Sequence, residues 1–160
     1  MMKIRVGFGF DVHQLKEGLN FCLGGIIIPH SKGSLGHSDA DVLIHTICDA
    51  LLGAANMGDI GKHFPDTSPV YKGIDSKILL KEVVNLINQK EYIISNIDST
   101  ICLQKPKIGK YIPEMKRVLS KCLKIDVEDI SIKATTTEKL GFVGREEGVS
   151  AYATVLIHKS

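Results

Sequence analysis

The sequence predicts an α+β fold, an α/β sandwich in which one mixed β-sheet packs on helices. The chain has 160 residues, the size of one ordinary domain, and 44% of them are hydrophobic, which is enough for a sizeable core. Segments with strand-like alternation occur towards both ends, and segments with apolar residues at helical spacing lie between them. We therefore expect a single domain over residues 1–160.

The first predicted strand covers residues 3–10, where Gly7 and Gly9 alternate with two phenylalanines. Glycines inside a strand often mark the close approach of another group. Residues 14–19 are expected to form a polar loop. Residues 20–28 are predicted to return as a second strand that pairs with the first as a hairpin.

A largely apolar helix is predicted after the glycine-rich loop that begins at Gly33. Ser38 or Asp39 is expected to be its N-cap, because short polar side chains satisfy the free backbone N–H groups there. Asp39 and Asp41 are then acids in the first turn, where the helix dipole favours them. The apolar pattern continues to Ala55.

The second half of the chain alternates loops with further helices and strands. Residues 56–73 are punctuated by glycine and proline and form a long loop, and such loops are often functional. Asp75 or Ser76 is predicted to cap a second helix that runs to about Gln89. The remaining elements are predicted to be a strand, a short helix and two more strands, at residues 92–104, 113–123, 129–134 and 149–157.

Composition excludes several classes of protein. The 20 basic and 18 acidic residues give a net charge of only +2, so no basic surface for nucleic acid is expected. No apolar run approaches the 18 or so residues that a membrane span needs, so no membrane partner is expected. The start leads directly into a strand pattern without a signal peptide. The four widely spaced cysteines suggest reduced thiols, and we predict a cytoplasmic protein.

Asp11 and His13 are a candidate pair of metal ligands at the end of the first strand. Side chains two apart in a strand point to the same face, so a carboxylate and an imidazole lie side by side. His45, inside the apolar helix, is a candidate third ligand. One Asp and two His suit zinc with one coordination position left open, which is the catalytic arrangement. The alternative is a solvated strand end, since this spacing is frequent.

His45 also belongs to a polar stripe on an otherwise buried helix. Asp41, His45 and Asp49 follow at intervals of four residues and share one face. A metal-bound histidine commonly donates its other ring N–H to a carboxylate, so Asp49 or Asp41 is the expected partner. The alternative for His45 is an ordinary hydrogen-bonded core residue.

Several loops carry groups that suit a phosphorylated substrate. Asp59 and Asp66 can bind sugar hydroxyls or simply form turns. Lys105 and Lys107 flank a proline and can meet phosphate or remain solvated. In the loop 135–148, threonine hydroxyls and backbone N–H groups can donate to phosphate, Glu138 can hold a hard cation, and Arg145 can form charge-assisted bonds. No nucleophile stands beside a basic partner, which favours metal-assisted chemistry.

Five ordered blocks of this sequence closely resemble the 2-C-methyl-D-erythritol 2,4-cyclodiphosphate synthase family. They are GFDVH at 9–13, HSDADV at 37–42, DALLGAA at 49–55, GDIGKHFPDT at 58–67 and KATTTEKLGF at 133–142. The resemblance implies a single catalytic domain that acts in the non-mevalonate isoprenoid pathway. Enzymes of this family convert 4-diphosphocytidyl-2-C-methyl-D-erythritol 2-phosphate into the cyclic diphosphate and release CMP, and the resemblance implies the same reaction for this chain. No cytidylyltransferase domain is expected.

The resemblance also implies cofactors and assembly. Asp11, His13 and His45 match the family's zinc ligands, and Glu138 matches the ligand of a second divalent cation, magnesium or manganese. His37 and Thr136 match residues that stabilise the transition state. The family is a homotrimer with its active sites between subunits.

The substrate contacts follow by the same match. The methylerythritol part is expected to meet Asp59 and Gly61, with Phe64, Asp66 and Ser68 nearby, and Ser38 is a further implied substrate contact. The cytidine part is expected to meet Leu103, Lys105, Pro106, Lys107, Gly109, Thr135 and Thr136. Asp11, His13, His37, Glu138, Phe142 and Arg145 complete the implied substrate contacts.

Three positions depart from the family's pattern, and two other functions compete. Ala40 replaces a usual glycine, which we expect a helix to tolerate. Lys110 stands where a proline is common, and Glu146 where a small residue is usual. The competing functions are a structural zinc protein, which needs a fourth protein ligand, and a module that binds nucleotide without chemistry.

Overall fold

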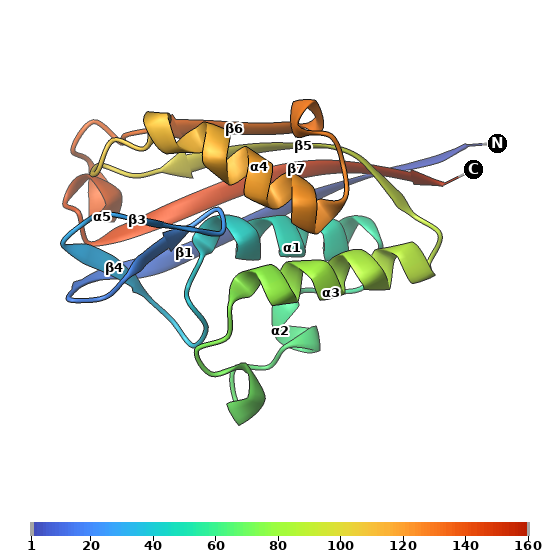
Figure 1. Ribbon diagram of the computed structural model, residues 1–160, viewed down its shortest axis with the longest axis horizontal. Coiled ribbons are helices and arrows are strands. Elements are labelled where there is room, and N and C mark those ends of the chain that lie inside the picture. The colour runs from blue at the N-terminus through green and yellow to red at the C-terminus, as the bar shows by residue number, and fades with distance from the viewer. Residues whose placement is uncertain (1, 160) are drawn as a thin grey trace.

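The structure, a computed structural model, describes residues 2–159 and is built on a five-stranded mixed sheet (Figure 1). The strand order is β4-β1-β7-β5-β6, in which β5 and β6 are parallel and the other neighbours are antiparallel. These strands are β1 (Lys3–Glu17), β4 (Lys32–Leu35), β5 (Ile93–Cys102), β6 (Ile130–Thr135) and β7 (Gly148–Lys159). The predicted α+β class with one mixed sheet is confirmed.

The helices vary widely in length. The longer ones are α1 (Val42–Ala54), α3 (Ser76–Gln89) and α4 (Ile112–Leu123), and α2 (Ile60–His63) and α5 (Gly141–Gly144) have a single turn each. Three 3-10 turns are η1 (Pro69–Tyr71), η2 (Gly109–Tyr111) and η3 (Val127–Asp129). Among residues 2–159, no helix is both long and apolar enough to span a membrane.

The contact between β1 and α1 explains the glycines of the first strand. A Cβ atom on Gly7 would lie 1.9 Å from the carbonyl oxygen of Ala50, and one on Gly9 would lie 2.1 Å from that of Thr46. Only glycine therefore permits this approach of strand and helix. Since neighbouring side chains alternate, Asp11 and His13 point to the same side as the glycines, towards α1.

The opposite side of β1 is apolar and exposed. Val6 is 63% exposed, Phe8 64% and Phe10 45%, and Tyr152 on the neighbouring strand β7 lies 5.0 Å from Phe10 between ring centroids. We call this surface of Val6, Phe8, Phe10 and Tyr152 the apolar sheet face. It contrasts with the helix-covered side, where the largest fully buried side chains include Phe21, Leu43, Ile47, Leu51, Leu80 and Ile97.

The N-terminal hairpin was predicted wrongly. β1 continues to Glu17, because its polar second half pairs with β4 and, as far as Gln14, with β7. The predicted strand at 20–28 is split into β2 (Phe21–Leu23) and β3 (Ile26–Ile28), which pair with one another as a separate two-stranded sheet. Asp11 and His13 thus lie inside a long strand, and β1 does not pair with the segment that follows it.

The start of α1 also differs from its prediction. Asp41 is the N-cap, and its side chain accepts a hydrogen bond from the backbone N–H of Ile44, so neither Asp39 nor Asp41 lies in the first turn. Ala40 precedes the helix with φ +56°, in the left-handed region that favours glycine. The expectation that a helix accommodates Ala40 was therefore wrong, because this residue is outside the helix and fully buried.

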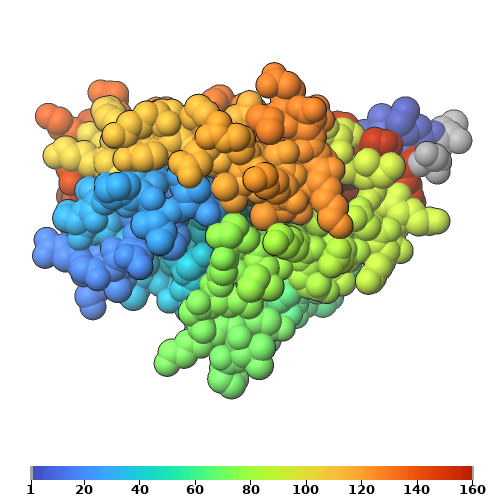
Figure 2. All heavy atoms as spheres, in the orientation of Figure 1, coloured from blue at the N-terminus to red at the C-terminus, as the bar shows by residue number. Residues whose placement is uncertain are grey.

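The other elements follow the predictions closely. Asp75 caps α3, which ends at Gln89 as expected, while α4 begins at Ile112, one residue before the predicted Pro113. The long loop between α1 and α3 contains α2 and η1. In the space-filling view this segment stands out from the rest of the molecule (Figure 2).

Candidate metal centre and active site

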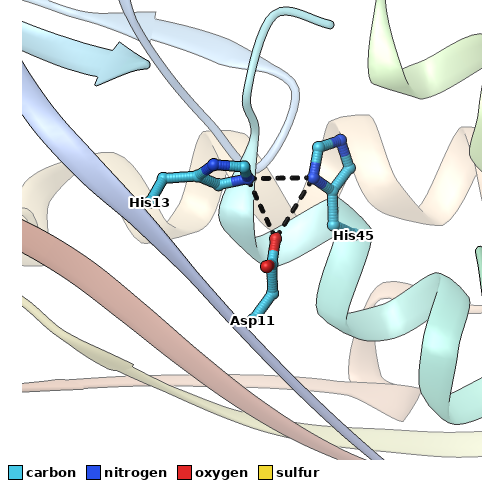
Figure 3. A group of neighbouring side chains, drawn as sticks. All are labelled: Asp11, His13 and His45. Carbon is cyan, nitrogen blue, oxygen red and sulfur yellow. Dashed lines mark hydrogen bonds and ion pairs between the residues drawn. The ribbon is translucent and has the colours of Figure 1, made fainter. Parts of the chain in front are cut away.

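Three side chains from β1 and α1 converge on one point (Figure 3). Oδ2 of Asp11 lies 3.0 Å from Nε2 of His13 and 3.2 Å from Nδ1 of His45, and the two ring nitrogens are 3.1 Å apart. A tetrahedral ion with bonds of about 2.0–2.1 Å to nitrogen and oxygen holds its ligand atoms about 3.3 Å apart. The three atoms therefore fit the corners of a zinc site with one corner free.

The opposite atoms of two of these ligands are fixed by the backbone. Nδ1 of His13 donates a hydrogen bond to the carbonyl oxygen of Leu35 at 3.2 Å, which leaves the lone pair of Nε2 facing the other ligands. Oδ1 of Asp11 accepts a hydrogen bond from the backbone N–H of Val12 at 2.8 Å. Both ligands are thus oriented by the strand and its neighbour β4.

The charges of the site favour an ionised carboxylate. Burial opposes ionisation of Asp11, but the hydrogen bond from His13 and the charges of the His13 and His45 imidazoles outweigh it and hold the pKa of this carboxyl below its usual range. Burial likewise opposes protonation of His13, yet its hydrogen bond to Asp11 and the carboxylate's charge raise the imidazole pKa. The carboxylate thus creates a negative point that attracts a cation.

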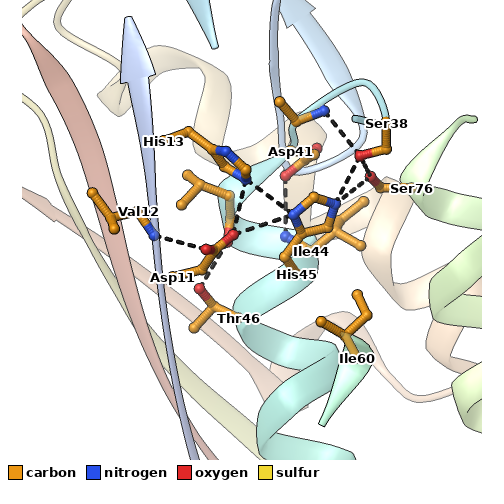
Figure 4. Close-up of polar contacts among 12 residues, drawn as sticks. Asp11, Val12, His13, Ser38, Asp41, Ile44, His45, Thr46, Ile60 and Ser76 are labelled. Atoms are coloured by element: carbon orange, nitrogen blue, oxygen red, sulfur yellow. Dashed lines mark hydrogen bonds and ion pairs between the residues drawn. The ribbon is translucent and has the colours of Figure 1, made fainter. Parts of the chain in front are cut away.

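The outer nitrogen of His45 meets hydroxyl groups, and the predicted carboxylate partners were wrong (Figure 4). Nε2 of His45 lies 2.9 Å from Oγ of Ser76 and 3.0 Å from Oγ of Ser38. Asp41 instead caps α1 and accepts from the backbone N–H groups of Gly24 and Gly25, at 2.9 and 2.7 Å. Asp49 accepts from the N–H of Ile60 at 2.7 Å and so fixes the start of α2.

A cavity of about 330 Å³ opens beside the three candidate ligands. His13, His37, Ser38 and His45 line one part of it, and Gly61, Phe64 and Asp66 line another, together with Ile60, Tyr71, Ile74 and Leu79, which sequence reasoning missed. Leu79 follows the core pattern of a predicted helix, and Ile60 and Tyr71 lie in the segment predicted as a loop, where their residue types alone do not mark them as wall residues.

Asp59 and Ser68, two further predicted residues, do not line this cavity. Asp59 caps α2 by accepting from the backbone N–H of Lys62 at 2.9 Å, and it is not among the cavity-lining residues. Nε2 of His37 donates to the carbonyl oxygen of Ser68 at 3.2 Å, which ties the protruding segment to the loop before α1. His37 is thereby held at the wall of the cavity.

A second cavity, of about 350 Å³, contains most of the residues predicted to meet cytidine. It is lined by Leu103, Pro106, Lys107, Ile108, Gly109, Ile112, Ala134, Thr135 and Thr136. Lys105 is the exception, because its ammonium group forms an ion pair of 3.0 Å with Glu146. The two cavities have no lining residue in common.

The remaining predicted residues, Glu138, Phe142 and Arg145, are exposed. Oγ1 of Thr136 donates to Oε1 of Glu138 at 3.2 Å, and Arg145 forms two hydrogen bonds of 3.0 Å to the carboxylate of Glu147. Among the described residues, the group that can share one ion contains Asp11, His13 and His45, and Glu138 is not part of it. Within one chain, the candidate residues therefore fall into two separate groups.

A family model and the related sequences identify the same family of proteins. The model of the YgbB family matches residues 4–158. A 2-C-methyl-D-erythritol 2,4-cyclodiphosphate synthase of Bacteroides thetaiotaomicron is 70% identical over 158 residues, which is 99% of each chain. The enzyme of that name from Parabacteroides distasonis is 63% identical over 158 residues, covering 99% of this chain and 98% of the relative.

Solved structures share the fold over the whole length of the chain. The bifunctional IspDF from Campylobacter jejuni matches with a TM-score of 0.96 and 39% identity, over 100% of this chain and 43% of that one. This chain thus spans less than half of that protein. An IspF from Plasmodium falciparum in complex with CDP matches with a TM-score of 0.86 and 36% identity, over 98% and 97% of the two chains.

Proposed function

We propose a reaction for this chain, which belongs to the YgbB family. It converts 4-diphosphocytidyl-2-C-methyl-D-erythritol 2-phosphate into 2-C-methyl-D-erythritol 2,4-cyclodiphosphate and CMP. It is a lyase of the non-mevalonate pathway of isoprenoid synthesis and acts as one catalytic domain over residues 1–160. The observation that supports this reaction best is the triangle of Asp11, His13 and His45 at the wall of a ligand-sized cavity.

Two divalent cations are part of the proposal. Asp11, His13 and His45 would hold zinc, and Glu138 would hold magnesium or manganese. When bound, these cations neutralise the charge that develops on the phosphate oxygens and hold the phosphates in line. The donor set supports zinc, since two imidazoles and one carboxylate are a usual catalytic set for that ion.

The substrate supplies its own nucleophile. An oxygen of the 2-phosphate forms a bond to the β-phosphorus, the bond from that phosphorus to the oxygen of CMP breaks, and CMP leaves with the electron pair. The chain therefore contributes mainly by binding and orientation. His37 and Thr136 would donate hydrogen bonds to oxygens that gain charge in the transition state, which requires that the hydrogens now donated to the Ser68 carbonyl and to Glu138 turn to the substrate.

The two cavities suggest how the substrate is divided. The methylerythritol part would occupy the first cavity, whose lining includes Ser38, Gly61, Phe64 and Asp66, and Asp59 and Ser68 would stand at its border. The cytidine part would occupy the second cavity with Leu103, Pro106, Lys107, Gly109 and Thr135. Lys105, Phe142 and Arg145 would contribute from the rim of this second group.

A homotrimer would join the two groups of residues into one site. The apolar sheet face supports this assembly, because large exposed apolar surfaces mark protein interfaces. A cytidine cavity of one subunit would then face the metal ligands of its neighbour. The four cysteines are free thiols, as is usual in a reducing compartment, which supports a cytoplasmic enzyme.

Phosphorus NMR of the purified protein tests the reaction and its metal requirement together. The protein is mixed with 4-diphosphocytidyl-2-C-methyl-D-erythritol 2-phosphate, zinc and magnesium, beside a sample treated with a chelator. We expect CMP and a cyclic diphosphate to form only in the sample that contains metal. A substrate that is bound but stays intact would instead identify a non-catalytic zinc- and nucleotide-binding module.

A further inference from the structure

We propose that Ser76 and Asp39 are positioning residues for His45, and that they fix the tautomer in which this ring presents a bare Nδ1 to Asp11 and His13. The inference rests on the proposed metal site. It concerns the hydrogen bonds at Nε2, on the side of the ring away from the other two ligands. Ser76, the first residue of α3, lies 31 residues from His45 in the sequence and 37 residues from Asp39, which belongs to the loop before α1.

The hydrogen bonds from Ser76 to Asp39 determine which atom is the donor between Ser76 and His45. The Ser76 hydroxyl donates to Oδ1 of Asp39, and the backbone N–H of Ser76 donates to Oδ2 of the same carboxylate at 3.1 Å. A hydroxyl has one hydrogen and can only accept once that hydrogen is used. Nε2 of His45, which is 2.9 Å from Oγ of Ser76, must therefore be the donor in this contact.

The consequence for the ring follows from its chemistry. A neutral imidazole carries one N–H, so a hydrogen on Nε2 leaves the lone pair of Nδ1 free. Nδ1 is the atom that faces Oδ2 of Asp11 and Nε2 of His13, at 3.2 and 3.1 Å (Figure 4). The chain of hydrogen bonds in which His45 donates to Ser76 and Ser76 donates to Asp39 thus prepares His45 as a ligand and holds the plane of its ring.

Ser38 is a weaker candidate for this role, although its Oγ is also 3.0 Å from Nε2 of His45. Its hydroxyl accepts from the backbone N–H of Ala40 at 3.1 Å, and no carboxylate takes its hydrogen. It can therefore serve either tautomer. Ser76 differs because it is fully buried and its hydrogen is committed to Asp39.

Burial adds an energetic reason. Ser76 has no exposed surface, and a hydroxyl in such a place costs free energy unless it is hydrogen-bonded. The N-cap of α3 is Asp75, so the helix does not need the Ser76 hydroxyl for its own start. The hydroxyl is accounted for by Asp39 and His45 alone, apart from a long contact of 3.4 Å to Ser38.

The test compares zinc affinity in Ser76→Ala, Asp39→Asn and the unchanged protein, by competition with a chromophoric chelator. Removing a group that orients a metal-bound histidine typically weakens affinity about 10- to 100-fold, and we expect this for Ser76→Ala. Ser95→Ala is a matched control, because Ser95 lies 2.7 Å from Nδ1 of His158, and His158 pairs with Ile4, nine residues along β1 from His13. We expect its zinc affinity to stay within twofold of the unchanged protein.

A second readout separates positioning from a general loss of structure. Nitrogen-15 NMR of the histidine rings in metal-free protein should give the Nε2–H tautomer for His45 and a mixture of tautomers in Ser76→Ala. Unchanged affinity and an unchanged tautomer in Ser76→Ala would overturn the inference. Neither measurement needs substrate, so a protein that binds zinc in this way but does not turn over would reject the reaction and leave the positioning role intact.

Discussion

The carboxylate of Asp41 accepts a 2.7 Å hydrogen bond from the backbone N–H of Gly25, which joins the start of α1 to the turn between β2 and β3. The same carboxylate accepts from the N–H groups of Gly24 and Ile44, at 2.9 and 3.0 Å, and it is fully buried. Three donors therefore surround one buried anion. The two-stranded sheet and the helix that carries His45 depend on it.

Replacing this carboxylate by an amide should destabilise the fold. In Asp41→Asn an NH₂ group must face a backbone N–H, and one buried donor loses its acceptor. We expect a loss of about 1–3 kcal/mol in the free energy of unfolding, measured by urea denaturation. Asp126→Asn is the control, because Asp126 makes the same kind of cap at an exposed position. Equal, small effects of both substitutions would contradict this account of Asp41.

Removing a candidate zinc ligand should abolish the metal and the activity but keep the fold. We expect His45→Ala and Asp11→Ala to purify without zinc and to lose nearly all turnover, with an unchanged circular dichroism spectrum. His158→Ala serves as the control, since His158 contacts Ser95 and is not one of the candidate ligands. Turnover by metal-free His45→Ala would rule out the proposed role of the site.

A charge on the apolar sheet face should dissociate the proposed trimer. Phe8 is 64% exposed in the single chain, and burying a glutamate there against a neighbouring copy would cost several kcal/mol. We expect Phe8→Glu to sediment as a monomer in analytical ultracentrifugation. Ile78→Glu, at a residue on α3 that is 55% exposed, should keep the assembly of the unchanged protein. If Phe8→Glu sediments like the unchanged protein, this face is not the interface.

The division of the candidate residues into two groups predicts complementation between inactive variants. His37 lines the first cavity and Thr136 the second, so each variant of the pair His37→Ala and Thr136→Ala should be inactive alone. In randomly mixed oligomers with sites between subunits, about one quarter of the sites combine two intact groups. We expect about that share of activity after the two variants are unfolded together and refolded. Absence of any gain would indicate sites built within one subunit.

Glu146 occupies a backbone conformation that favours glycine, with φ +59°. The family's pattern leads us to expect a small residue at this position, and glycine is the small residue that this conformation favours. We expect Glu146→Gly to be more stable than Glu146→Ala by about 1 kcal/mol, because only glycine adopts this region without strain. Thermal unfolding of the two variants measures the difference. Both lose the ion pair with Lys105, so that contact does not affect the comparison.

Local rules were sufficient for the part of the fold and of the site that depends on short segments. Alternation along β1 places Asp11 and His13 on one face, and a lone histidine in a buried helix points to His45. The failures concern tertiary contacts. The polar half of β1 becomes a strand only because β4 and β7 pair with it. The link from His45 to Ser76 depends on how α1 packs on α3, and no spacing within α1 reveals it.

The two glycines of β1 act on the metal centre from a distance. Gly9 lies against the carbonyl oxygen of Thr46, the residue that follows His45, at a spacing that leaves no room for a methyl group. A methyl group at Gly9 would clash with the backbone of α1. The helix would have to move away from the strand, and His45 would move with it, away from Asp11 and His13. The distance between His45 and the two ligands on β1 therefore depends on the absence of a side chain at Gly9.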